Sequence, residues 1–113
     1  MNNEKVKSIL REILTDLEIK VYLASLESPL TIQELAKKAG LNRSGTYRIV
    51  ENLISKGLLS REIKTHGQKI VAEHPKKVLQ LLGNSQRKLR RKELEFEEHI
   101  PELLANFNIG ENK

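Results

Sequence analysis

The sequence predicts a mainly helical fold with one small β-hairpin and a long C-terminal helix. Apolar residues recur at helical spacing over most of the 113-residue chain, and a short stretch after residue 57 changes to alternating spacing. Aromatic residues make up 4% of the chain and charged residues 31%, a balance that suits short amphipathic helices better than an all-β fold. A chain of this length accommodates one small domain and an appendage, and dimerisation would usefully enlarge its core.

Composition limits the class of protein. Cysteine is absent, which excludes disulfides, thiolate zinc sites and thiol redox sensing. No apolar run approaches the roughly 18 residues of a membrane span, and the amino-terminal stretch MNNEKVKSIL does not have the pattern of a signal peptide. We therefore expect a cytoplasmic protein that makes no membrane contact.

The first two predicted helices carry most of the expected core. Val6, Ile9, Leu10, Ile13 and Leu14 form one apolar stripe, which Asn3 is expected to cap. Thr15 and Glu18 then have the spacing of a capping box, so a second helix should run from about Asp16 to Glu27. This helix is apolar on most sides and should be the central, most buried one; its apolar residues are Leu17, Ile19, Val21, Tyr22, Leu23, Ala24 and Leu26.

A short helix, a tight turn and a longer helix follow. Pro29 interrupts the helical pattern, and Thr31 and Glu34 form a second capping box. The short helix bears Ile32, Leu35, Ala36 and Ala39 and should end at Gly40 in a left-handed conformation. Asn42 is a good cap for the next helix, about Arg43 to Lys56, which Gly57 ends. Its inward face should consist of Thr46, Ile49, Val50, Leu53 and Ile54.

The alternating stretch predicts a hairpin of two short strands, within 58–64 and 69–73. His66-Gly67 lies between them, and we expect a tight two-residue turn with Gly67 at positive φ. The helical period returns after Pro75. This order of elements predicts a winged helix-turn-helix over residues 1–74 and a dimerisation helix and tail over 75–113.

The winged arrangement favours binding to double-stranded DNA, because a helix fits the major groove and a basic hairpin can follow the phosphates. Charge agrees with this interpretation: residues 37–69 hold eight Lys and Arg against two acids, within a net charge of +5 for the chain. Projection of the second helix places Ser44, Arg48, Glu51 and Ser55 opposite its apolar stripe. The candidate DNA-binding residues are Asn42, Arg43, Ser44, Thr46, Tyr47, Arg48, Lys64, His66, Gln68 and Lys69.

Other functions have less support in the residues. His66, His74 and His99 are scattered, no phosphate-binding loop is present, and Ser44 has no base nearby in sequence, so we expect neither an enzyme nor a metal or cofactor site. A winged helix can also act as a protein–protein adaptor of the transcription machinery without base readout. The polar and basic outer face from Arg43 to Arg48 favours DNA over such a partner. RNA binding ranks third because stacking aromatics are few.

Three stretches resemble the DNA-binding domain of TrmB-like transcriptional regulators: LTDLEIKVYLA (14–24), LAKKAGLNRS (35–44) and YRIVENLISKGL (47–58). The resemblance covers about residues 13–82 and implies a dimeric winged-helix repressor or activator. Larger members carry a C-terminal effector domain that binds sugars in some of them, and the chain stops about where that domain would start, so sugar sensing is not carried over and no small-molecule effector is evident. Gly45 stands where the family commonly has a side chain, which either permits close approach to DNA or is tolerated near the helix start.

The C-terminal helix has the pattern of an antiparallel dimerisation element. Leu82, Leu89, Phe96 and Leu103 recur at seven-residue intervals, and Ile100 and Phe107 widen this seam. Residues 87–92 are largely basic and residues 93–98 largely acidic, so a dyad between Lys92 and Glu93 would pair opposite charges and superimpose the seams. A symmetric homodimer predicts an inverted-repeat operator.

Two alternatives compete with this pairing. Arg91 and Glu95 can form an exposed pair within one helix, or the basic block can touch DNA. Pro101 should kink or restart the helix near Ile100.

Overall fold

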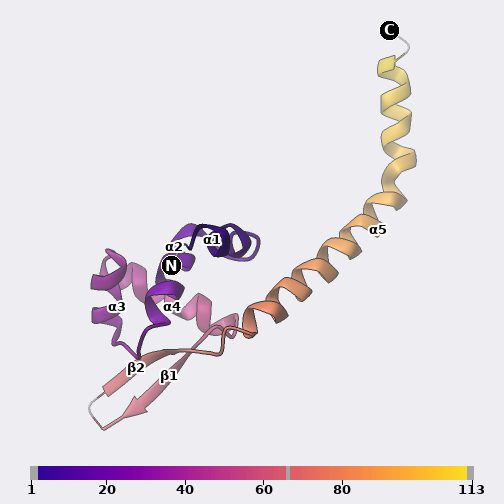
Figure 1. Ribbon diagram of the computed structural model, residues 1–113. Helices are drawn as coiled ribbons and strands as arrows, with labels where there is room; N and C mark the ends of the chain where they lie inside the picture. The colour runs from indigo at the N-terminus through magenta and orange to yellow at the C-terminus, as the bar shows by residue number, and fades with distance from the viewer. Residues whose placement is uncertain (1–2, 66, 112–113) are drawn as a thin grey trace. The chain divides into compact units, whose positions relative to one another are not determined.

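The computed structural model describes residues 3–65 and 67–111, and this part of the chain forms five helices and one hairpin (Figure 1). The elements are α1 (Glu4–Leu10), α2 (Asp16–Ser25), α3 (Ile32–Ala39), α4 (Arg43–Ser55), β1 (Leu59–Lys64), β2 (Gly67–Ala72) and α5 (Lys77–Glu111). The predicted fold class is confirmed. The elements divide into two compact units, residues 1–82 and 83–113.

The amino-terminal end of α2 is held by the predicted capping box. The Thr15 backbone N–H donates to Glu18 Oε1 at 2.8 Å, and the Glu18 N–H donates to Thr15 Oγ1 at 3.2 Å. The predicted Asn3 cap of α1 is wrong. Asn3 has φ −91° and ψ 1°, outside the extended conformation from which a cap side chain reaches the first free N–H groups, and its side chain makes no capping hydrogen bond.

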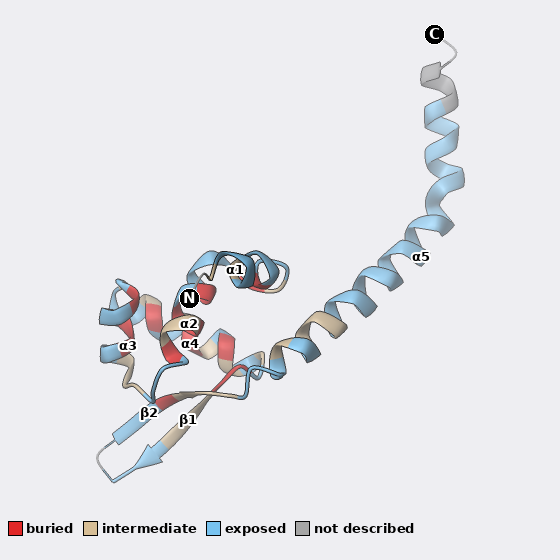
Figure 2. Ribbon diagram, in the orientation of Figure 1, coloured by how far each residue is buried: buried red, intermediate tan, exposed pale blue. Residues whose placement is uncertain are grey.

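The core of the first unit lies between α2, α3, α4 and the base of the hairpin (Figure 2). Val21, Leu35, Val50 and Leu53 are fully buried, one from α2, one from α3 and two from α4. Burying each such side chain stabilises the fold by about 1.5–3 kcal/mol. The sequence predicted a helix that is buried on most sides, but Leu17 and Leu26 are 49% and 40% exposed. Burial of α2 is therefore less complete than expected.

A partly buried ion pair joins α2 to the end of α4. Glu18 is 4% exposed, and both of its carboxylate oxygens lie 3.1 Å from Lys56 Nζ. Lys56 also donates to the Ile13 carbonyl at 3.3 Å. The same carboxylate therefore caps α2 and receives a cation 38 residues away in sequence. This satisfies the buried charge, which would otherwise be costly.

The hairpin is antiparallel and is anchored to the body of the unit. Its register runs from Leu59 opposite Ala72 to Lys64 opposite Gly67. Ile70 exchanges two backbone hydrogen bonds with Leu30, the residue just before α3's cap, at 2.6 and 3.1 Å. Gly67 has φ 114°, which confirms the predicted positive φ. Gly67 pairs with Lys64 and is the first residue of β2, so it does not lie in the connection between the strands.

The long helix α5 contributes to both units. Val78 and Leu81 in its first turns pack against the core of the first unit. In the second unit the helix continues through Pro101 without the restart that the sequence allowed, and it bends in its C-terminal half (Figure 1). None of the described helices is both long and apolar enough to cross a membrane.

Candidate nucleic-acid interface

The turn between α3 and α4 places the first turn of α4 at the surface. Gly40 adopts φ 70° and ψ 34°, and its N–H reaches the carbonyls of Ala36 and Lys37, which closes α3 as predicted. Leu41 packs against the core, and its N–H donates to the Ala36 carbonyl at 2.9 Å. The chain therefore turns sharply and enters α4 at Asn42.

Asn42 caps α4 with its side-chain oxygen. Oδ1 accepts a hydrogen bond from the Gly45 N–H at 2.6 Å and another from Ser44 Oγ at 3.2 Å. A Cβ added to Gly45 would lie 2.8 Å from the same oxygen. The glycine thus leaves room for the cap, a reason that neither interpretation of Gly45 from the sequence included.

The outer side of the first two turns of α4 carries three large side chains without internal partners. Arg43, Tyr47 and Arg48 are exposed, Tyr47 by 53%, and none of the three makes a hydrogen bond or an ion pair within the described part of the chain. Arg43, Ser44 and Tyr47 border an open hollow of about 660 Å³. The opposite side is anchored by Val50 and Leu53, so this face is held toward solvent.

Thr46 does not belong to this surface, which corrects its assignment as a DNA-binding residue. It is 0% exposed, and its hydroxyl donates to the Asn42 carbonyl at 2.8 Å. Its place on the inward face, one helical turn before Val50, puts the side chain into the core. Thr46 therefore packs in the core beneath α4, and its side chain is not accessible to an external ligand in this conformation.

Glu51 also departs from the projected outward face. Its carboxylate forms an ion pair with Arg61 of β1, so an acid of α4 faces the hairpin. This pair ties the wing to α4 and neutralises the one carboxylate that would otherwise stand on the polar face of α4. The sequence did not indicate the contact, because helix periodicity places Glu51 on a face without naming its neighbour.

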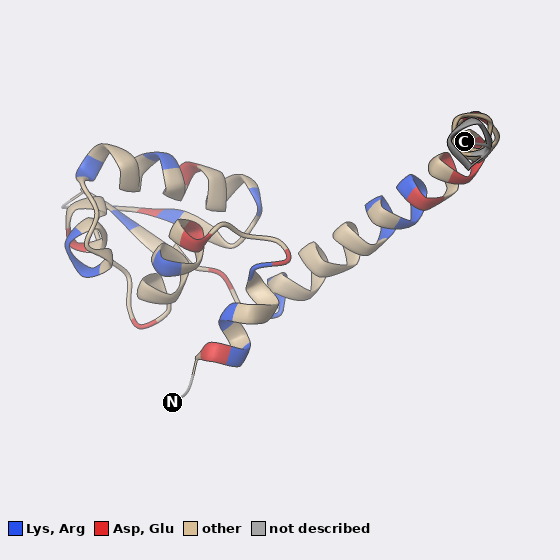
Figure 3. Ribbon diagram, turned by 90° about the horizontal axis from the view of Figure 1, so that it is seen from above, with Lys and Arg blue, Asp and Glu red and all other residues tan. Residues whose placement is uncertain are grey.

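Internal pairing reduces the basic surplus that the sequence suggested for residues 37–69. Four of the eight cations meet carboxylates: Lys38 with Glu27, Lys56 with Glu18, Arg61 with Glu51 and Lys64 with Glu62. Lys37, Arg43, Arg48 and Lys69 form no such pair among the described residues. Within residues 37–69, the described cations without a carboxylate partner therefore lie at the end of α3, at the start of α4 and in β2. Figure 3 marks all Lys and Arg along the ribbon, both those that are paired and those that are not.

The wing presents Lys64, Gln68 and Lys69 as exposed side chains, whereas His66 lies outside the described residues. A hydrogen bond to Glu62 at 2.7 Å raises the pKa of Lys64 above its ordinary value and keeps it cationic. Lys69 lies close enough to Glu34 of α3 to contribute to lowering the pKa of that carboxyl, after the larger effects of the Thr31 hydrogen bonds. Ile63, which the sequence did not single out, is 77% exposed beside these polar residues.

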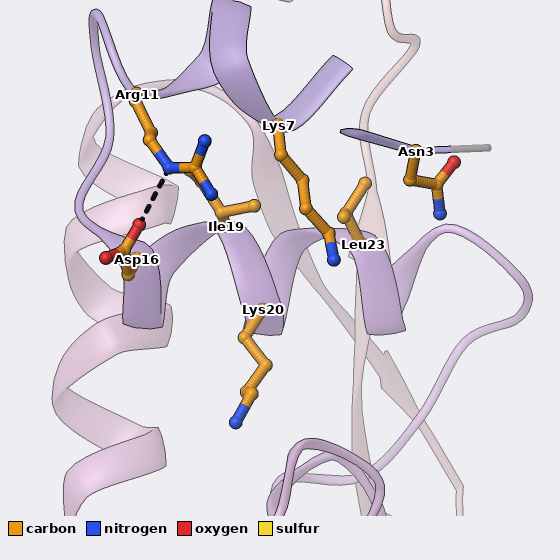
Figure 4. A pocket seen from close by; sticks show the side chains of 7 residues that line it. All are labelled: Asn3, Lys7, Arg11, Asp16, Ile19, Lys20 and Leu23. Carbon is orange, nitrogen blue, oxygen red and sulfur yellow. Dashed lines mark hydrogen bonds and ion pairs between the residues drawn. The ribbon is translucent and has the colours of Figure 1, made fainter. Parts of the chain in front are cut away.

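A separate polar hollow of about 340 Å³ lies between α1 and α2 (Figure 4). Lys7, Arg11 and Lys20 border it, and Arg11 is paired with Asp16 at 3.2 Å. It is built from elements other than α4 and the wing, so it is not part of the candidate interface. No group of three His, Asp or Glu residues that could hold a metal occurs in the described ranges.

A family model described as sugar-specific transcriptional regulator TrmB matches residues 14–78, more than half of the chain. The chain belongs to the TrmB family. The match includes α2, α3, α4 and the hairpin, which confirms the resemblance seen in the sequence. The chain has the winged-helix fold of this family.

One curated relative matches about half of the chain. The uncharacterized protein YrhO of Bacillus subtilis (strain 168) is 45% identical over 56 residues, which are 48% of this chain and 20% of that protein. The chain thus spans about a fifth of the length of this curated relative.

Solved structures share the fold over most of the chain. The ST1889 protein from Sulfolobus tokodaii is 26% identical with a TM-score of 0.67, covering 81% of this chain and 98% of that one. The transcriptional regulator BldR from Sulfolobus solfataricus is 26% identical with a TM-score of 0.51, covering 92% and 81%. TrmBL2, described as an archaeal chromatin protein with a novel mode of DNA binding, has a TM-score of 0.70 at 20% identity, covering 92% and 41%, a likeness of fold alone.

Proposed function

We propose that this regulator binds double-stranded DNA in a sequence-specific manner as a homodimer. The first turn of α4 enters the major groove, and the wing follows the phosphate backbone. The exposed cations Arg43 and Arg48, which have no carboxylate partner among the described residues, carry this proposal. Arg contacts guanine through two hydrogen bonds, each good pair contributing about 1–3 kcal/mol of discrimination.

The remaining site residues divide between base reading and backbone contact. Ser44 and Tyr47 stand on the same face as the two arginines and offer hydroxyls to bases or adjacent phosphates. Asn42 positions the turn, since its side-chain oxygen is already engaged by Gly45. On the wing, Lys69 and Gln68 meet phosphates, and Lys64 does so with Glu62 beside it. His66, which lies outside the described residues, is a further proposed contact to the DNA backbone.

Selection of bound sequences from random duplex DNA tests the proposal, followed by titration of the selected site. Arg43→Ala and Arg48→Ala should each weaken binding by about 1–3 kcal/mol and relax selectivity at one base position. Lys69→Ala should weaken all sequences alike and lower the salt slope by about one. Lys5→Ala removes an exposed cation of α1 and serves as the matched control.

The outcome also separates DNA binding from the adaptor function. Exposed Ile63 and Tyr47, at 77% and 53%, are side chains that a protein partner could cover. If neither arginine variant changed DNA binding, or if no sequence were enriched, base readout by α4 would be wrong. Capture of a protein partner that is lost in Ile63→Ser would then favour the adaptor.

The second unit supplies the dimer contact in this proposal. Leu89, Phe96, Leu103 and Phe107 are 70%, 60%, 47% and 62% exposed, and Ile100 is 39% exposed. An amphipathic helix with a bare apolar seam is typical of helix pairing. Leu82, the first seam residue, is half-buried in the first unit.

Charge supports an antiparallel direction with the dyad between Lys92 and Glu93. Within the helix, Arg90 pairs with Glu93 and Lys92 with Glu95, three residues apart in both cases, rather than Arg91 with Glu95. Exposed pairs of this kind contribute little, about 0–1 kcal/mol. Because these pairs are weak, the oppositely charged residues of a second copy can compete for the same side chains.

Sedimentation of the intact chain at micromolar concentration tests the dimer. Because the chain has no cysteine, a mixture of Leu89→Cys and Phe96→Cys variants reports the direction by cross-linking. The antiparallel register predicts that the two variants link to each other and that Leu89→Cys alone does not link to itself. A monomer would end the dimer proposal and with it the inverted-repeat operator.

A further inference from the structure

An apolar groove lies on the first unit, away from α4 and the wing residues proposed to meet DNA. It has a volume of about 370 Å³ between α1, α2 and the first turns of α5. Buried Leu10 and Tyr22 lie beneath it, while Val6, Ile9 and Leu79 border it with 43%, 47% and 68% of their surface exposed. Among the described residues, none that is charged lines the groove. An exposed apolar hollow of this kind usually marks an interaction site.

We propose that this groove receives the C-terminal part of α5 from a second copy of the chain, with Phe107 as the anchor. The inference rests on the antiparallel dimer of the proposed function and adds a second contact to it. In that dimer the docked segment would join the helix pair to the winged-helix unit of the other copy.

The register of the antiparallel pair identifies the occupant. A dyad between Lys92 and Glu93 sets Val78 opposite Phe107 of the second copy, as it sets Leu82 opposite Leu103. Val78 and Leu82 line the groove. The same pairing that superimposes the central seam therefore delivers three exposed apolar side chains to the groove: Leu103 at 47%, Leu104 at 49% and Phe107 at 62% exposure.

The geometry of α5 explains why the occupant comes from another molecule. Val78 and Phe107 belong to one continuous helix, in which each residue rises about 1.5 Å. A continuous helix cannot lay its last turns over its first ones. A second copy running in the opposite direction can, and an aromatic side chain that fills a pocket is a typical interface anchor.

Cross-linking between separately prepared full-length variants tests the docking in trans. Ile9→Cys on α1 mixed with Phe107→Cys should form a disulfide-linked dimer, because Ile9 borders the groove. Lys5→Cys is the matched control, since Lys5 is an exposed residue of α1 that does not line the groove. Linkage at Lys5 as efficient as at Ile9 would show collision without docking and would overturn the inference.

The Leu89→Cys and Phe96→Cys mixture separates failure of the inference from failure of the dimer. If those two link while Ile9→Cys and Phe107→Cys do not, the dimer stands and the docking is wrong. If neither mixture links and the chain sediments as a monomer, the dimer itself is wrong. A disulfide within a single Ile9→Cys/Phe107→Cys chain, without dimer linkage, would also overturn the inference.

A second measurement identifies what fills the groove. Phe107→Ala should weaken dimerisation at least tenfold, whereas Leu94→Ala, an exposed leucine outside the seam, should leave it nearly unchanged. An apolar dye such as anilinonaphthalene sulfonate should bind the Phe107→Ala variant more strongly than the intact dimer. Equal binding would mean that the groove is open to small apolar molecules, and docking of the partner helix would be wrong.

Discussion

The winged-helix unit, residues 1–82, and the helical unit, residues 83–113, differ in the burial of their apolar side chains. In the first unit Leu35, Val50 and Leu53 are fully buried. In the second, every described side chain from residue 84 to 107 is exposed, including Leu89 and Phe96. Both units show apolar residues at helical spacing, so periodicity alone does not say whether a stripe packs within its own chain. The first unit has its own core, and the second has a face without one.

The largest expected difference between the two units is in the free energy of unfolding lost when a leucine side chain is shortened. Leu53→Ala should lower the free energy of unfolding by about 2–5 kcal/mol, because the cavity cannot fully collapse. Leu94→Ala removes the same atoms from an exposed site of α5 outside the seam and should change it by less than about 0.5 kcal/mol. Urea unfolding at one fixed protein concentration measures both. Similar losses from the two variants would contradict the division between the units.

Within the helical unit, dimerisation should respond to a charge placed in the seam of α5 and not to one placed outside it. Phe96→Asp places a carboxylate in the proposed dimer contact and should raise the dimer dissociation constant at least about 30-fold, the effect of removing a 2 kcal/mol anchor. Leu94→Asp is the control outside the seam. Sedimentation equilibrium measures both, and circular dichroism checks that helix content is kept. Equal shifts for the two variants would argue against a specific seam.

Within the winged-helix unit, the wing depends on one backbone conformation. Gly67 has φ 114°, which a β-branched residue adopts poorly, so Gly67→Val should cost about 1–3 kcal/mol locally. Gln68→Val introduces the same side chain one residue later, where φ is not positive. Amide hydrogen exchange of β1 and β2 should accelerate in the first variant only. Unchanged protection in Gly67→Val would show that the hairpin does not need this conformation.

The smallest predicted effect concerns the cap of α4. Asn42→Ala should cost about 1 kcal/mol by removing the cap. Gly45→Ala should be nearly neutral, because the gain of about 0.5–1 kcal/mol from replacing glycine is offset by displacement of the Asn42 side chain. In the Asn42→Ala background the same change should become stabilising. Thermal unfolding of the four proteins measures this coupling, and strict additivity would mean that Gly45 does not serve the cap.

Most helix boundaries and the two capping boxes could be predicted from the sequence, because they depend on residues three or four positions apart. Thr15 with Glu18 and Thr31 with Glu34 hydrogen-bond as their spacing indicated. Asn3 failed because its backbone does not adopt the extended conformation that capping needs. The residue type is necessary for a cap, and the local backbone angle decides whether it forms.

The sequence predicted which side of α4 is exposed, but it predicted less well which individual side chains belong to the candidate interface. Arg43, Tyr47 and Arg48 lie on the exposed side of α4 as the projection indicated. Thr46 turned out to be core, although its position on the inward stripe could have excluded it. Four cations counted toward the basic surplus are engaged by carboxylates, and the positions of those partners depend on how the elements pack.

The sequence by itself determined the order of elements, the capped start of α4 and the apolar spacing of the α5 seam, since each follows from spacing within a few turns of one helix or hairpin. Only the tertiary structure decided which charged side chains form ion pairs within the chain. Glu18 and Lys56 are 38 residues apart, and Glu51 and Arg61 belong to a helix and a strand. It also decided that Leu17 stays exposed while Leu35 is buried. Such contacts depend on how helices and strands pack in three dimensions, which local periodicity does not specify.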